Sequence, residues 1–180
     1  MNGIHHLDLI QHLTGRHITR AVAEVGDPPP GLEVEEVAAA ALRLEGGGIG
    51  SVSLSSTSPG ASGDERIELD GALGRLELPD PYAGGPLRLY LRGAWGGFAP
   101  DLWQSIDPPT TRPYAASVEA FVRAVQAGRP APVGAPEAAA ALAAVLAIYR
   151  SGISGRAVHV DPDRLPERLT ESEQGPATAG

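Results

Sequence analysis

The chain has 180 residues, a mass of 18.5 kDa and a formal net charge of −8 at pH 7, with 42% hydrophobic and 20% charged residues. This composition predicts one globular domain with a packed core, and the acidic balance argues against nucleic acid or an anionic membrane as the main partner. All 14 basic residues are arginine and cysteine is absent, which excludes Schiff-base and P-loop lysines, thiolate nucleophiles and disulfides.

The N-terminal half is predicted to contain one helix followed by antiparallel strands. Ile4, Leu7, Ile10 and Leu13 recur at helical spacing and Gly15 follows, which predicts a helix over residues 4–14. Period-two alternation with glycine or proline turns then predicts strands. These strands cover residues 17–25, 34–44, 49–56, 66–70, 75–78 and 87–91.

The C-terminal half is predicted to consist of a loop, two helices and a last strand. Residues 93–112 are rich in Gly, Pro and Trp and predict a long loop. Helices are predicted over 113–127, with one apolar stripe, and over about 136–151, where alanine predicts close packing. A strand follows over 156–160. We expect residues 1–160 to form the domain and residues 161–180 a mobile tail.

Strands and helices come in blocks, which is typical of the α+β class. We therefore expect a largely antiparallel open sheet with helices packed on one face. The longest apolar run has 12 residues, from Ala138 to Tyr149, whereas a bilayer span needs about 20. The N-terminus also has no signal-peptide pattern, so a soluble, cytoplasmic protein is expected.

The glycine cluster Gly46–Gly50 is the one place that suggests a dinucleotide loop. Ser51 stands where the third glycine of G-x-G-x-x-G would follow Gly46 and Gly48. The cluster also joins two predicted strands, whereas the fingerprint joins a strand to a helix. We interpret it as a hairpin turn and expect no cofactor-binding residues in this chain.

Four histidines, His5, His6, His12 and His17, lie in or beside the first predicted helix. At 100° per residue, Asp8 lies about 60° and His12 about 20° from His5, so the three share one face. His5 and His12 are about 10.5 Å apart along the axis, which disfavours one shared metal ion. Acid–base chemistry and ordinary solvated histidines are the remaining interpretations.

Five segments, in order, resemble the Gfo/Idh/MocA oxidoreductases, the glucose–fructose oxidoreductase and inositol dehydrogenase family. The first, residues 3–15, is similar to the family's G-x-H-x-x-D…L-x-G segment, with His5 and Asp8 at the named positions. The others are residues 37–56, 67–76, 114–130 and 147–158. The resemblance covers residues 1 to about 160 and concerns only the family's C-terminal domain.

The resemblance implies a C-terminal substrate-binding and dimerisation domain of an NAD(P)-dependent oxidoreductase that acts on a sugar, polyol or related hydroxy compound. It places the catalytic proton carrier at His5. The family's Rossmann domain and its catalytic lysine are outside this chain, so we expect a truncated form, inactive without a nucleotide-binding domain. NAD or NADP, a homo-oligomer formed through the sheet and a separate nucleotide-binding domain are the implied cofactor and partners.

The candidate substrate-binding residues are Asp8, Trp95, Trp103, Arg112 and Tyr114. Tryptophan also serves simple packing, and Arg112 and Tyr114 are equally consistent with surface capping. His159 is expected to be structural. The alternative function is a non-catalytic binding or assembly module of the same fold, because a fold does not determine activity.

Overall fold

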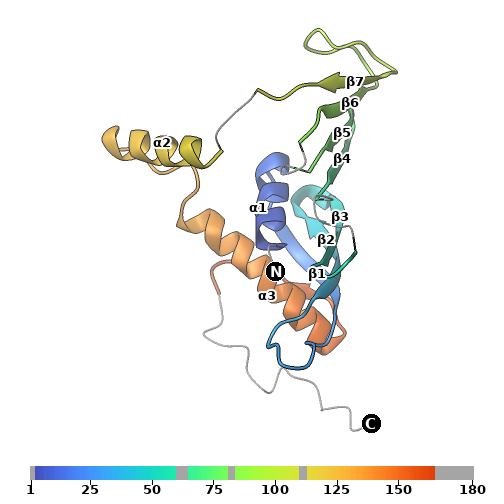
Figure 1. Ribbon diagram of the computed structural model, residues 1–180, viewed down its shortest axis with the longest axis vertical. Coiled ribbons are helices and arrows are strands. Elements are labelled where there is room, and N and C mark those ends of the chain that lie inside the picture. The colour runs from blue at the N-terminus through green and yellow to red at the C-terminus, as the bar shows by residue number, and fades with distance from the viewer. Residues whose placement is uncertain (1–2, 60–64, 81–83, 110–112, 165–180) are drawn as a thin grey trace. The chain divides into compact units, whose positions relative to one another are not determined.

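The computed structural model describes residues 3–59, 65–80, 84–109 and 113–164 (Figure 1). The chain divides into two compact units, unit 1 with Met1–Thr57 and Ala120–Gly180, and unit 2 with Ser58–Glu119. The described residues form two open four-stranded antiparallel sheets and three α-helices. The predicted α+β class is confirmed, but the strands form two sheets rather than one.

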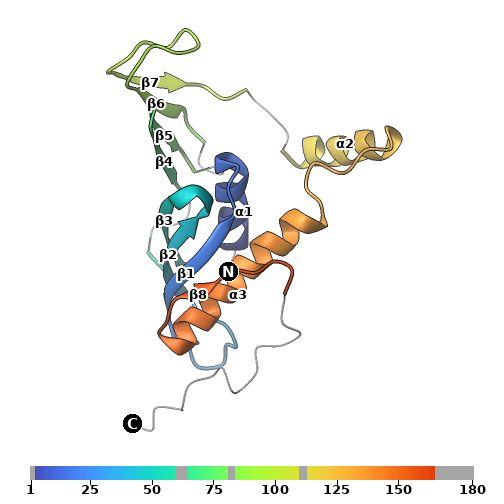
Figure 2. The same ribbon diagram turned by 180° about the vertical axis from the view of Figure 1, so that it is seen from behind.

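Unit 1 contains a sheet with strand order β3-β2-β1-β8. Successive side chains of a strand point to opposite faces of the sheet, so β1 and β2 present about every second side chain to the core. The very short β8 pairs with β1 and is visible in Figure 2. The elements are α1 (Gly3–Thr14), β1 (Ile18–Val25), β2 (Val37–Leu44), β3 (Ile49–Ser55), α3 (Ala135–Ser154) and β8 (Val158–His159).

One face of this sheet forms the core of the unit. Strand β2 alternates without exception between exposed and buried positions along its eight residues. Its buried side chains, with those of β1, form a cluster with α1 and α3. The cluster comprises Leu7, Ile18, Ala21, Ala23, Ala40, Leu42, Leu44, Ala144, Ala147 and Ile148. Helices thus cover one face, as predicted, and the other face carries the exposed side chains.

Helix α3 approaches strand β1 closely because small residues line the contact. A Cβ atom at Gly152 would lie 2.8 Å from Cγ2 of Val25, so no larger residue fits there without a shift. The fully buried Ser151 Oγ accepts a hydrogen bond from Ala23 N–H at 2.9 Å and donates one to the carbonyl of Arg156 at 2.6 Å. The predicted close packing of this alanine-rich helix is therefore confirmed.

The ends of α3 are defined by backbone hydrogen bonds. The Glu137 carboxylate accepts a hydrogen bond from Gly134 N–H at 2.8 Å, and this bond holds the pKa of Glu137 below its usual value. At the other end, Gly155 has φ 63° and donates its N–H to Ser151 O. The helix has 20 residues and is apolar enough to cross a membrane by length and composition, but seven of its residues are buried in unit 1, as in a core helix.

The segment before β2 is tied to α3 by one hydrogen bond. The Tyr149 hydroxyl donates to Oε2 of Glu35 at 2.7 Å, and Glu35 is only 8% exposed. Burial, together with this carboxylate, raises the pKa of Tyr149 to about 12. The phenol therefore stays protonated and keeps its partner across the physiological range.

Unit 2 contains a second sheet in which every strand pairs with its neighbour in sequence, in the order β4-β5-β6-β7. The strands are β4 (Ile67–Gly71), β5 (Gly74–Leu78), β6 (Leu87–Leu91) and β7 (Trp103–Ile106). The prediction of an uninterrupted loop over 93–112 was wrong, because β7 lies within it. This strand has only four residues, and its pairing with β6 defines it more than its own sequence does.

Gly74 is required by the turn between β4 and β5. A Cβ atom there would lie 2.0 Å from the carbonyl oxygen of Tyr90, which is backbone and cannot move aside. The turn therefore brings the start of β5 directly against the end of β6.

Helix α2 (Pro113–Gln126) forms within one residue of the predicted range, and the boundary between the units along the chain falls within it, after Glu119. Its apolar stripe, however, is exposed: Val118 is 63% and Phe121 is 56% accessible. An amphipathic pattern predicts that such a stripe is covered by another surface.

Candidate functional site

Helix α1 presents a row of polar side chains on the surface of unit 1. Leu7 is 1% exposed and Gln11 is buried, so this side of the helix faces the core. His5 and His12 are exposed, and Asp8 is half-buried on the same turn as His5. The structure therefore confirms the helix and brings His5 and Asp8 to neighbouring positions at its surface.

The orientation of α1 is fixed by contacts on both sides of Gly15. The Gln11 side-chain oxygen accepts the N–H of Ile18 at 3.0 Å, which joins the helix to the start of β1. Beyond the helix, Arg16 donates to the carbonyl of Glu45 at 3.1 Å, and the Glu45 carboxylate accepts the N–H of His17 at 3.2 Å. The helix carrying His5 is thus held against the β2–β3 hairpin.

This arrangement is suited to proton transfer. An accessible imidazole can give a proton to, or take one from, a hydroxyl group that reaches it. The Asp8 carboxylate, three residues further along, lies within one turn of the helix from His5. Among the described ranges, no group of three or more His, Asp or Glu residues is placed to hold a metal ion.

A ladder of charged side chains crosses the polar face of the sheet in unit 2. Arg75 pairs with Glu68, with Asp70 at 3.8 Å and with Glu77 at 3.4 Å. Glu77 in turn pairs with Arg88 of the next strand at 2.8 Å. In the strand register Asp70 lies opposite Arg75 and Glu77 lies opposite Arg88, whereas Glu68 lies opposite Glu77 and reaches Arg75 diagonally. Opposite charges on neighbouring strands thus stabilise this face.

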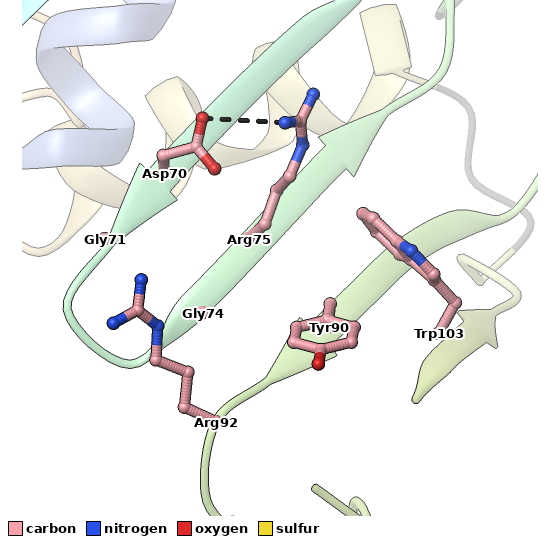
Figure 3. Close-up of a pocket in the computed structure, with 7 residues that line it drawn as sticks. All are labelled: Asp70, Gly71, Gly74, Arg75, Tyr90, Arg92 and Trp103. Carbon is pink, nitrogen blue, oxygen red and sulfur yellow. Dashed lines mark ion pairs between the residues drawn. The ribbon is translucent and has the colours of Figure 1, made fainter. Parts of the chain in front are cut away.

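A shallow hollow of about 310 Å³ lies beside this ladder (Figure 3). The Tyr90 and Trp103 rings lie opposite each other on β6 and β7, with centroids 5.7 Å apart and planes tilted by 57°. The Arg88 guanidinium carbon lies 4.4 Å from the centroid of the Trp103 ring. The lining residues are Asp70, Gly71, Gly74, Arg75, Tyr90, Arg92 and Trp103.

The hollow combines aromatic surface with hydrogen-bonding groups. Figure 3 shows the Arg92 side chain extending over the β4–β5 turn, toward Gly71. The Tyr90 hydroxyl has a long hydrogen bond, 3.4 Å, to the Asp101 carboxylate. Aromatic rings beside guanidinium and hydroxyl donors are suited to a polyhydroxylated or carboxylated small molecule.

The predicted substrate-binding residues have different positions. Trp103 lines the hollow, whereas Trp95 forms an isolated bridge with Phe98 and is 67% exposed. Tyr114 is 82% exposed near the start of α2. Arg112 lies outside the described residues.

Sequence reasoning missed the other residues of the hollow, notably Arg75, Tyr90 and Arg92. The signal that identifies them is the strand register, because Arg75 lies opposite Tyr90 and Tyr90 lies opposite Trp103. Because residues 93–112 were predicted to be a loop, the pairing of β6 with β7 could not be predicted.

The glycine cluster does not form a dinucleotide cradle. Gly46 and Gly47 have φ of 69° and 89° in a 3₁₀ turn, Glu45–Gly47, that joins β2 to β3. A Cβ atom at Gly46 would lie 2.9 Å from Nη1 of Arg16, so the space beside this glycine holds a side chain of the protein. No helix N-terminus follows the turn, and the hairpin interpretation is confirmed.

The sequence matches a known family over residues 1–160, described as the oxidoreductase family, C-terminal α/β domain. No curated protein sequence matches the chain.

Solved structures share its fold at low sequence identity. An aldose-aldose oxidoreductase from Caulobacter crescentus, complexed with glycerol, is 23% identical with a TM-score of 0.72, covering 87% of this chain and 45% of its own. An oxidoreductase domain protein from Kribbella flavida is 20% identical with a TM-score of 0.75, covering 89% and 49%. An oxidoreductase from Agrobacterium radiobacter, in complex with NAD⁺, L-tartaric acid and magnesium, is 21% identical with a TM-score of 0.70, covering 89% and 48%. The chain thus spans about half the length of these structures.

Proposed function

Because the chain belongs to the C-terminal α/β domain family of the Gfo/Idh/MocA oxidoreductases, we propose that it is the substrate-binding and dimerisation part of an NAD(P)-dependent oxidoreductase. The substrate class is a sugar, a polyol or a related hydroxy compound. The family match over residues 1–160 is the observation that carries this proposal.

His5 is the proposed proton carrier. Its side chain is exposed on α1, and α1 is anchored through the buried Leu7 and Gln11 and through Glu45. An imidazole nitrogen would exchange a proton with the substrate hydroxyl or carbonyl oxygen as the carbon changes oxidation state. Asp8, one turn away on the same helix, would hold the substrate or the imidazole by hydrogen bonding.

The nicotinamide cofactor supplies or accepts the hydride in such a reaction when it is bound. The glycine cluster does not fit the pyrophosphate of that cofactor, since it forms a 3₁₀ turn between two strands and has Arg16 beside Gly46. We therefore assign no part of cofactor binding to these residues, and place it in a nucleotide-binding domain on the same or another polypeptide.

The outward face of the sheet β3-β2-β1-β8 is the proposed dimer contact. In the described part of unit 1, α1 and α3 pack on the opposite face, and the outward face exposes Val22 at 45% and Val37 at 48%. On this face Ala39 and Ala41 of β2 lie opposite Ser53 and Ser51 of β3, and these small side chains leave room for a second copy related by a twofold axis. A cytoplasmic location is proposed with this function.

A matched pair of histidine variants tests the proposal. The 180-residue chain is combined with the NAD-binding half of the Agrobacterium relative, and NADH formation is followed with glycerol, glucose, inositol and tartrate. We expect His5→Asn to reduce kcat by about 10²-fold or more. His12→Asn is the control, because His12 is another exposed histidine of α1, two turns further along.

The outcomes separate the two functions that the sequence left open. Loss of turnover in His5→Asn alone supports the proton carrier, and equal turnover in both variants refutes it. A chain that forms a stable dimer but gives neither turnover nor NADH binding in the mixture is a non-catalytic assembly module.

A further inference from the structure

The hollow of unit 2 takes no part in the proton transfer proposed for His5. All the residues that line it belong to Ser58–Glu119, so its shape is defined within one unit. Its volume of about 310 Å³ is at the lower end of the range for ligand pockets. Gly71 and Gly74 contribute backbone alone to the lining, which leaves the space above the β4–β5 turn open to a small molecule (Figure 3).

Arg92 differs from the two arginines of the charge ladder in its charge partners. Arg75 contacts three carboxylates, and Arg88 pairs with Glu77 at 2.8 Å. Within the described ranges, the exposed Arg92 guanidinium has no carboxylate at ion-pair distance. A guanidinium presents paired N–H donors that match the two oxygens of a carboxylate. Arg92 therefore offers the hollow a bidentate site for an anion from outside the chain.

Two aromatic rings provide the apolar surface of the hollow. The rings of Tyr90 and Trp103 lie with their centroids 5.7 Å apart. The Arg88 guanidinium carbon lies 4.4 Å from the Trp103 ring centroid, and Glu77 holds that guanidinium in place. These contacts orient Trp103 in advance, which lowers the entropy cost of binding. Trp103 is still 40% exposed, so part of its ring remains available to a ligand.

The hollow also offers partners for hydroxyl groups. The Asp70 side chain is 72% exposed, and its contact with Arg75 is 3.8 Å, too long for a hydrogen bond. The Tyr90 hydroxyl has only the long hydrogen bond to Asp101, 3.4 Å. A carboxylate accepts hydrogen bonds and a phenol can donate one. Hydroxyl groups of a ligand can therefore both donate and accept in this hollow.

We propose that the hollow binds a hydroxylated ring that carries a carboxylate, which is the chemistry of a uronic acid. The ligand carboxylate accepts from the Arg92 guanidinium, the C–H face of the ring packs against Tyr90, and a ring hydroxyl donates to Asp70. A neutral sugar leaves Arg92 without an anion, and an acid without hydroxyl groups leaves Asp70 unused. This inference is independent of the proposed oxidoreductase function, because it involves neither His5 nor a nicotinamide.

Binding to the intact 180-residue chain is measured by tryptophan fluorescence at constant ionic strength, and by ligand-observed NMR. Trp95→Phe leaves Trp103, which lines the hollow, as the only tryptophan. Methyl β-glucuronide is compared with methyl β-glucoside, which lacks the carboxylate, and with cyclohexanecarboxylate, which lacks the hydroxyl groups. We expect the glucuronide to bind about tenfold or more tightly than either of the others.

Two variants assign the contacts. Arg92→Gln should weaken glucuronide binding about tenfold or more and abolish its advantage over the glucoside. Arg129→Gln is the matched control, because Arg129 is an exposed arginine outside the hollow. Asp70→Ala should weaken the glucuronide and leave cyclohexanecarboxylate binding unchanged or stronger. Circular dichroism verifies that each variant is folded.

Three results overturn the proposal. The first is equal binding of glucuronide and glucoside. The second is an equal loss in Arg92→Gln and Arg129→Gln, which assigns the attraction to general surface charge. The third is the absence of binding at about 10 mM glucuronide, which makes Arg92 an ordinary hydrated arginine. None of these results changes the expectation for His5→Asn, so the two proposals fail or stand separately.

Discussion

Unit 1 and unit 2 are both built on four antiparallel strands, yet they bury their side chains differently. In unit 1, α1 and α3 cover one sheet face and produce a cluster of residues that are 7% exposed or less. In the described part of unit 2, Leu91 is the one buried hydrophobic residue, and the aliphatic side chains of β4 and β5 are only partly covered. The ion pairs of its polar face supplement the backbone ladder.

Because of this difference, substitutions in the two sheets should change the free energy of unfolding by different mechanisms. Removing atoms from a closed core leaves a cavity, and the loss of free energy is large. When one partner of an exposed ion pair is removed, water can hydrate the remaining group, so the loss of folding free energy is small. The free energy of unfolding should therefore depend strongly on unit 1 side chains and weakly on the charge ladder of unit 2.

The largest effect is expected at Leu7, which is 1% exposed and joins α1 to the core. Leu7→Ala should lower the free energy of unfolding by about 3 kcal/mol through lost burial and the cavity left behind. Urea unfolding followed by circular dichroism measures it. Leu73→Ala, at a position 75% exposed in the β4–β5 turn, is the control and should change stability by less than about 0.5 kcal/mol. Equal losses for the two variants would contradict the contrast between the units.

An intermediate, pH-dependent effect is expected at Tyr149. Its pKa is raised to about 12 in the folded protein, against about 10 in the unfolded chain, because burial and Glu35 favour the neutral phenol. The neutral Tyr149 phenol therefore adds to the free energy of unfolding fully below about pH 10, and this contribution is lost as the pH rises toward about 12. Tyr149→Phe should lower stability by about 1 kcal/mol at pH 7 and flatten the decline above pH 10.

Urea midpoints between pH 7 and pH 12 measure this effect. Tyr114→Phe is the control, because Tyr114 is 82% exposed and its substitution should leave the pH profile of the parent protein unchanged. If Tyr149→Phe keeps the full alkaline decline, the hydrogen bond to Glu35 is not its source.

The smallest effect is expected in the charge ladder. Glu77→Gln removes the carboxylate shared by Arg75 and Arg88, yet the arginine side chains are 36% and 50% exposed. The loss should be below about 1 kcal/mol and should shrink further at 1 M NaCl. Asp107→Asn, an exposed carboxylate of unit 2 outside the ladder, is the comparison. A loss of several kcal/mol for Glu77→Gln would show that unit 2 depends on the ladder as unit 1 depends on its core.

Sequence patterns predicted those strands and helices whose local sequence determines their secondary structure. The strand-like run before the glycine turn at 46–48 predicted β2, although residues 37–42 are all apolar and its buried face is defined only in the structure. Helical spacing of apolar residues predicted α1. Strand β7 was missed because four residues in a Gly- and Pro-rich segment become a strand only through pairing with β6. The separation into two sheets was not predicted. A hairpin pattern predicts which neighbouring strands pair, but it does not predict whether one hairpin pairs with the next.

The candidate site was predictable to a smaller extent. The spacing of His5 and Asp8 placed them on one helix face, but the role of His5 came only from the family resemblance. The hollow of unit 2 depends on the register that aligns Arg75, Tyr90 and Trp103, and no single stretch of sequence contains that information. The amphipathic pattern of α2 was correct as a pattern, while its exposure depends on what else is present.

The insertion of unit 2 into unit 1 also affects events on the ribosome. Strands β4 to β7 pair in order of synthesis and can assemble soon after they emerge. The sheet of unit 1 is completed later, because its contacts with α3 join distant parts of the chain. The hydrogen bond between Ala23 and Ser151 spans 128 residues, and the one between Glu35 and Tyr149 spans 114. During that interval the apolar face of β1 and β2 is uncovered in the nascent chain, which makes it prone to aggregation until α3 leaves the exit tunnel.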